Sequence, residues 1–220
     1  MNVILFGATG MVGQGVLREC LLSSEVDKIL TIGRTATGQQ SAKLHEIVLG
    51  DLSALPAGEA DLASYDACFF CLGVSSAGMG EADYTRITHD LTLNVAQTLV
   101  KLNPHMTFIY VSGTGTDSSE KGGSMWARVK GRTENDLLGL GFRQAYMFRP
   151  GYIQPLDGVK SKTPLYSLVY AVLAPVYPIL KAIAPNYVTT TGQVGRAMIN
   201  LAKQGSQKTH FENRDINAVG

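Results

Sequence analysis

Three glycines near the N-terminus have the spacing of a phosphate-binding turn. Gly7, Gly10 and Gly13 follow a short apolar run at residues 2–6 and open a stretch with helical periodicity. In such a turn one glycine makes the bend, one lets the backbone approach a pyrophosphate and one lets the helix pack closely on the strand. The helix N-terminus adds positive potential. We therefore predict dinucleotide binding rather than an empty strand-to-helix turn, through Gly7, Thr9, Gly10, Met11, Val12 and Gly13.

A basic side chain follows the next predicted strand, residues 28–32. Arg34 and Thr35 stand where an acidic residue would bind the ribose 2′-hydroxyl of NAD. A guanidinium beside a hydroxyl suits a 2′-phosphate instead. We therefore expect NADP rather than NAD, the alternative being that Arg34 is a solvated surface residue.

Apolar runs alternate with helical patterns along most of the chain, which predicts a parallel sheet covered on both faces. We expect an α/β fold of the Rossmann type, with a doubly wound parallel sheet and a small C-terminal apolar lobe. Further strands are predicted at residues 28–32, 45–49, 67–72, 107–111 and 145–148, with a short one from residue 210. Besides the helix after the glycine turn, helices are predicted at residues 82–102, 124–140 and 193–203.

Composition excludes several classes of protein. The chain has 220 residues, of which 45% are hydrophobic and 17% charged, so it is not disordered, and its net charge of +1 gives no broad basic face for nucleic acid. Three cysteines, an odd number, and an N-terminus without a basic stretch argue against secretion, so we expect a cytoplasmic protein. Cys68 and Cys71 lie three apart on a predicted strand and so face opposite sides. With four scattered histidines, we expect no metal site.

The run at residues 163–180 contains no charged residue and is long enough to raise a membrane span. Pro175 and Pro178 would break a spanning helix, so we expect two short apolar helices instead. We assign them to a lobe at residues 152–188 on the substrate side of a single domain covering residues 1–220. An interfacial membrane contact is left open.

At these positions the sequence resembles the short-chain dehydrogenase/reductase superfamily, in particular its atypical and extended members, which are NAD(P)-binding or nucleoside-diphosphate-sugar epimerase-like. Besides the glycine turn, the resemblance rests on Gly50-Asp51-Leu52, Cys71-Leu72-Gly73, Tyr110-Val111-Ser112-Gly113, Val129-Lys130-Gly131 and Arg149-Pro150-Gly151. It implies that Asp51 and Leu52 lie by the adenine, Leu72 and Gly73 by the ribose, and Pro150 and Gly151 near the nicotinamide. It also implies a catalytic role for Ser112, a role in catalysis and ribose binding for Lys130, and a water-linked proton path through Asn94.

The sequence departs from the family pattern at Trp126, where the family has the tyrosine that serves as acid and base. That tyrosine precedes the lysine by one helical turn, so the ammonium lowers its pKa from about 10. Indole donates a hydrogen bond but cannot shuttle a proton. Three alternatives stay open: an acid from Ser112, Thr114 or Tyr152, a protein that binds coenzyme without turnover, or a tyrosine of the lobe. The lobe tyrosines are Tyr166, Tyr170, Tyr177 and Tyr187.

We therefore expect an NADP-dependent oxidoreductase that acts on a small or apolar carbonyl or hydroxyl compound, with Trp126 in the catalytic set. The uncharged run at residues 163–180 argues against a nucleotide sugar, whose phosphates need basic partners. The alternatives are a non-catalytic NADP(H) sensor and an epimerase-like enzyme. The predicted partner is a small molecule, with neither nucleic acid nor a stable membrane span, and a homodimer is left open.

Overall fold

Parallel strands form the centre of the computed structural model, which describes residues 1–53, 55, 61–156, 158–159, 177 and 183–220. Within these residues the main sheet has seven strands in the order β3-β2-β1-β4-β5-β6-β9, all paired in parallel. This is the doubly wound order, in which the chain reverses direction across the sheet beside β1. The strands are β1 (Asn2–Phe6), β2 (Lys28–Gly33), β3 (Leu44–Val48), β4 (Ala67–Phe70), β5 (Thr107–Val111), β6 (Gln144–Arg149) and β9 (His210–Glu212).

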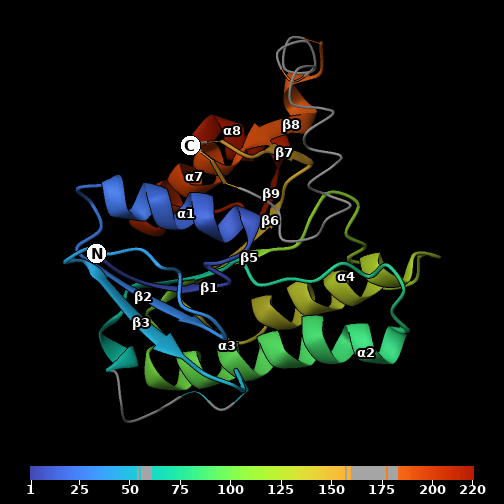
Figure 1. The fold of residues 1–220 in the computed structure, drawn as a ribbon. Coiled ribbons are helices and arrows are strands. Elements are labelled where there is room, and N and C mark those ends of the chain that lie inside the picture. Colours follow the sequence, from blue (N-terminus) through green and yellow to red (C-terminus); the bar gives the residue numbers. More distant parts are fainter. Residues whose placement is uncertain (54, 56–60, 157, 160–176, 178–182) are drawn as a thin grey trace.

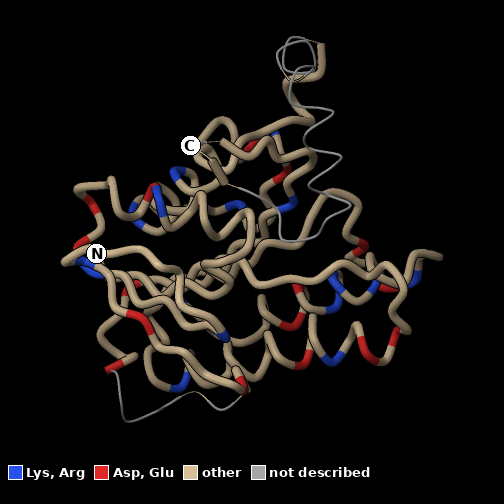
Figure 2. Tube along the Cα trace, viewed as in Figure 1, with Lys and Arg blue, Asp and Glu red and all other residues tan. Residues whose placement is uncertain are grey.

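Helices cover both faces of this sheet, as predicted (Figure 1). One layer contains α1 (Met11–Leu22), α7 (Thr191–Gln204) and α8 (Asn213–Val219), and the other contains α2 (Glu81–Thr85), α3 (Leu91–Leu102) and α4 (Met125–Leu138). The helix expected at residues 82–102 includes a π-helical segment, Arg86–Asp90, between α2 and α3. Basic and acidic residues are interspersed along the trace in Figure 2.

The strand β1 explains why the buried strands read as continuous apolar runs. Val3 and Leu5 belong to the core beneath α1 and α7, whereas Ile4 and Phe6 belong to the core that contacts α3. Because successive side chains of a strand point to opposite faces, a strand covered on both sides needs apolar residues at every position. The same alternation separates Cys68 from Cys71, which pack against different cores.

The C-terminal part differs from the sequence expectation in two ways. The short strands β7 (Tyr152–Gln154) and β8 (Val188–Thr190) form a second, two-stranded parallel sheet. After β9, the predicted tail strand, the chain continues into α8, whose start is fixed by a reciprocal capping box between Glu212 and Asp215.

The predicted apolar helices of the lobe lie outside the described residues, apart from Tyr177. Short 3₁₀ turns occur at Leu62–Ser64 and Pro185–Tyr187. Over the described part of the chain, none of the helices has the length and apolar character needed to cross a bilayer.

Candidate functional site

The glycine turn joins β1 to α1 in a conformation that only small residues permit. Gly7 has a φ of 78°, in the left-handed region, and its carbonyl accepts a hydrogen bond of 2.9 Å from the amide of Gly10. A Cβ on Gly13 would lie 2.1 Å from the same carbonyl, so α1 can approach the strand only with glycine there. The first turn of α1 carries no acidic residue, which leaves its positive end available to an anion.

A cleft of about 540 Å³ opens beside this turn, at the carboxyl ends of the parallel strands. Most of the residues predicted from the sequence line it: Gly7, Thr9, Gly10, Met11, Val12, Arg34, Thr35, Leu52, Leu72, Gly73, Ser112, Lys130, Pro150 and Gly151. The cleft is long, because its wall includes residues after β2 at one end and after β6 at the other. Its shape and its glycine cradle therefore fit a dinucleotide.

Lys130 is the basic group of α4 that faces this cleft. Its Nζ donates a hydrogen bond to the backbone carbonyl of Ser112, at the end of β5. Burial lowers the pKa of Lys130 to about 8, and the carboxylate of Glu134, one helical turn away, acts in the opposite direction. Lys130 thus has a transferable proton near neutral pH, in the range that suits an acid catalyst.

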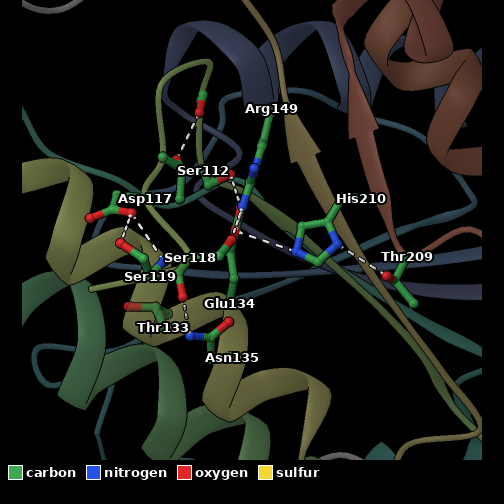
Figure 3. A network of polar contacts seen from close by, with 12 residues as sticks. Ser112, Asp117, Ser118, Ser119, Thr133, Glu134, Asn135, Arg149, Thr209 and His210 are labelled. Atoms are coloured by element: carbon green, nitrogen blue, oxygen red, sulfur yellow. Dashed lines mark hydrogen bonds and ion pairs between the residues drawn. The ribbon is translucent and has the colours of Figure 1, made fainter. Parts of the chain in front are cut away.

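The hydroxyl of Ser112 takes part in a buried polar network beneath the cleft (Figure 3). It donates a hydrogen bond of 2.5 Å to Glu134, whose side chain is 0% exposed, and lies 3.0 Å from the carbonyl of Phe148. The Arg149 guanidinium also contacts Glu134, with Nε at 3.0 Å and 3.2 Å from the two carboxylate oxygens. His210 of β9 lies 3.6 Å from the same carboxylate, and burial lowers the pKa of this imidazole. Glu134 therefore connects α4, β5 and β6.

Four of the predicted site residues lie apart from the cleft lining. Gly13 affects the cleft indirectly, because its lack of a side chain lets α1 contact the end of β1 closely. Asp51 is exposed, and its carboxylate accepts hydrogen bonds from the amide and hydroxyl of Ser53, which lowers its pKa. Asn94 is exposed on α3.

Trp126 is the fourth of these residues. A Cβ on Gly115, in the loop after β5, would lie 3.3 Å from its indole ring. The sequence placed Asn94 and Trp126 on the right helices, but the direction of each side chain depends on how its helix packs.

The alternative acids are held by other contacts. Thr114 Oγ1 donates a hydrogen bond of 3.0 Å to the carbonyl of Arg149, and the Tyr152 hydroxyl donates one of 2.8 Å to Gln154. Tyr187 is 68% exposed. The predicted tyrosines at 166 and 170 lie outside the described residues.

Glu46 is a cleft residue that the sequence analysis missed. It lies on β3, directly beside Thr31 of β2 in the sheet register, and lines the same wall as Arg34 and Thr37. No motif marks it in the sequence, because its neighbours come from the pairing of two strands. The only signal for Glu46 in the sequence was its position on an alternating, half-buried strand next to the predicted ribose site.

Comparison with solved structures identifies the class of fold that this chain adopts. The enzyme WbmF of Bordetella bronchiseptica, in complex with NAD⁺, superposes with a TM-score of 0.68 at 14% identity, covering 99% of this chain and 76% of that one. A short-chain dehydrogenase/reductase of Saccharomyces cerevisiae gives 0.64 at 11% identity, covering 99% and 98%. The chain therefore has the fold of the atypical short-chain dehydrogenase/reductase superfamily.

Two curated proteins have sequences similar to that of this chain. The Fmp52 protein of Emericella nidulans is 32% identical over 159 residues, covering 69% of this chain and 66% of the relative. An Fmp52-2 protein of Aspergillus oryzae is 26% identical over 221 residues, covering 98% and 95%. No family model matches the chain.

These relatives correct one prediction, since both are named as mitochondrial proteins. The expected cytoplasmic location is therefore wrong. The cysteine count that suggested it argues only against an oxidising compartment. It does not distinguish among the remaining compartments.

Proposed function

We propose that this protein is a nicotinamide-dinucleotide-dependent oxidoreductase that interconverts a small or apolar carbonyl compound and its alcohol. The observation that carries the proposal is the presence of Lys130 in the same cleft as the glycine turn. The turn and the N-terminus of α1 suit the pyrophosphate, and the far end of the cleft, at Pro150 and Gly151, suits the nicotinamide. The chain then works as a single dinucleotide-binding domain, with residues 152–188 on the substrate side.

We assign the proton transfer to Lys130. A bound nicotinamide coenzyme supplies hydride chemistry, and reduction of a carbonyl also needs one proton on its oxygen. The Lys130 ammonium provides that proton, becomes a neutral amine, and recovers a proton from water in the cleft. Its lowered pKa keeps this exchange within reach of neutral pH. The Ser112 carbonyl, as acceptor of its hydrogen bond, holds Nζ at the wall of the cleft. Trp126, in place of a tyrosine, leaves this role to Lys130.

We propose NADP as the preferred coenzyme on the basis of Arg34. Its guanidinium is exposed, lines the cleft beyond β2 and has no recorded hydrogen bond or ion pair within the part of the chain that the structure describes. A charge-assisted bond to a 2′-phosphate is worth about 1.5–3 kcal/mol, roughly tenfold or more in affinity. Arg34→Gln should weaken NADPH binding by about that factor and leave NADH binding unchanged. Arg132→Gln, which removes an exposed arginine of α4, is the control. Equal losses for both coenzymes would contradict the assignment.

The test of the whole proposal has two stages. Calorimetric titration with NADPH and NADH measures binding, and absorbance at the nicotinamide band then follows oxidation of the reduced coenzyme with a panel of aldehydes, ketones and nucleotide sugars. Oxidation with carbonyl compounds supports the proposal, and activity with nucleotide sugars alone favours the epimerase-like alternative. Tight binding without oxidation favours a coenzyme sensor, which the missing tyrosine at Trp126 supports. Absence of binding by either coenzyme contradicts all three.

A further inference from the structure

The side chain of Glu46 is fixed against the loop that follows β2. Its Oε2 accepts a hydrogen bond of 3.0 Å from the Thr31 hydroxyl and one of 2.8 Å from the Thr37 amide. Thr31 precedes the loop and Thr37 lies within it, so the carboxylate ties the loop back onto the edge of the sheet. Two hydrogen bonds to one oxygen leave the carboxylate with little freedom to turn away.

The other carboxylate oxygen is available to a ligand. Oε1 of Glu46 has no hydrogen-bond partner within the described residues, and the half-buried side chain lines the cleft. Arg34 and Thr35 line the same end of the cleft, within a few residues of Thr37. A cation and an anion therefore share the site where the adenosine ribose of a dinucleotide would lie.

The two side chains favour different coenzymes. An ionised carboxylate only accepts hydrogen bonds, so it suits a 2′-hydroxyl, which donates one, and repels a 2′-phosphate. Arg34 has the opposite preference. In the usual fingerprint the acidic residue follows the second strand directly in the sequence, whereas here the acid comes from the neighbouring strand.

We propose that Glu46 is a coenzyme-specificity residue that opposes Arg34, so that the cleft accepts both NADH and NADPH. This inference rests on the proposed function, because it assumes a dinucleotide in the cleft. It adds that the discrimination between the two coenzymes is a balance between Glu46 of β3 and Arg34 directly after β2, and that removal of Glu46 shifts the preference toward NADPH.

The test compares charge removal with charge retention at this position. Glu46→Gln keeps an oxygen acceptor for the Thr37 amide but removes the charge, and Glu46→Asp keeps the charge. Glu25→Gln removes an equivalent charge from an exposed residue that pairs with Lys203, outside the cleft lining. Dissociation constants for NADH, NADPH, adenosine 5′-monophosphate and adenosine 2′,5′-bisphosphate are measured by calorimetry at low and high salt. Thermal unfolding without ligand checks that each variant is folded.

In Glu46→Gln the affinity for NADPH relative to NADH should rise about three- to tenfold at low salt and less at high salt. The two adenosine phosphates should follow the same trend, which places the effect at the 2′ position. Glu46→Asp and Glu25→Gln should stay within about twofold of the parent, as expected for a purely electrostatic cause.

An unchanged ratio in Glu46→Gln, with both dinucleotides bound, overturns this inference and leaves the proposed function standing. An equal rise in Glu46→Asp also overturns it, because the cause is then the loop and not the charge. Absence of binding of either dinucleotide by the parent overturns the proposed function and this inference together.

Discussion

Substitution of Lys130 provides the most informative test. Burial of the Lys130 charge destabilises the folded protein, whereas the proposed proton transfer requires this side chain. Its pKa of about 8 lies below the usual 10.5. At about 1.4 kcal/mol per pH unit, this difference corresponds to about 3 kcal/mol of destabilisation. Because the half-buried side chain also meets water in the cleft, we expect about 1–2 kcal/mol. Lys130→Met removes the charge and keeps most of the apolar volume.

The sign of the pH dependence follows from protonation in each state. Below about pH 8 the lysine is protonated in both the folded and the unfolded protein, so the full cost of the buried charge is present. Between about 8 and 10.5 the folded protein loses this proton first and the cost disappears. The difference in unfolding free energy, Lys130→Met minus parent, should therefore be larger at pH 7 than at pH 10.5 by about 1–2 kcal/mol. Loss of the bond to the Ser112 carbonyl subtracts about 1 kcal/mol at every pH.

Urea titrations followed by circular dichroism measure this difference at both pH values. Because other groups titrate in the same range, only the comparison between the two proteins is interpreted. Lys121→Met, at an exposed loop position, is the control and should show no such pH dependence. A difference that is independent of pH, or larger at pH 10.5, would refute the assigned environment of Lys130. The same variant should also weaken coenzyme binding, without lowering the unfolding free energy at pH 7.

Three other variants test separate parts of the structure. Gly13→Ala should abolish coenzyme binding in calorimetry and lower the unfolding free energy by more than about 2 kcal/mol in urea titrations, because its Cβ would lie 2.1 Å from the Gly7 carbonyl. Gly50→Ala, whose Cβ would meet open space, is the control and should change the unfolding free energy little. Glu134→Gln should lower the unfolding free energy by about 3–5 kcal/mol, because it leaves the Arg149 guanidinium without its buried partner. A loss below about 1 kcal/mol would mean that water solvates this pair. Trp126→Phe should leave the coenzyme dissociation constant within about twofold of the parent in calorimetry, because the indole packs on Gly115 outside the cleft lining. A tenfold loss of affinity would place the ring at the nicotinamide instead.

Local rules account for the parts of this protein that were predicted correctly. A strand covered on both faces needs apolar residues throughout, so β1 is recognisable from residues 2–6 alone. The glycine turn is recognisable because a positive φ and a close helix contact both exclude side chains. The helix predicted at residues 124–140, which carries Lys130, is also observed as α4. In each case the constraint acts within a few consecutive residues.

Only the tertiary structure decides which of these residues meet. Glu46 enters the cleft because β3 pairs with β2 in a register that places it beside Thr31, and no local pattern fixes that register. Trp126 and Lys130 share a helix, yet only Lys130 lines the cleft, because the packing of α4 determines which side chains face it. The sequence by itself therefore determined the strands of the main sheet, the glycine turn and the two basic residues of the cleft, Arg34 and Lys130. The arrangement of charges in the cleft depends on contacts between segments that are distant in the sequence. These contacts form only when the strands pair into the complete sheet.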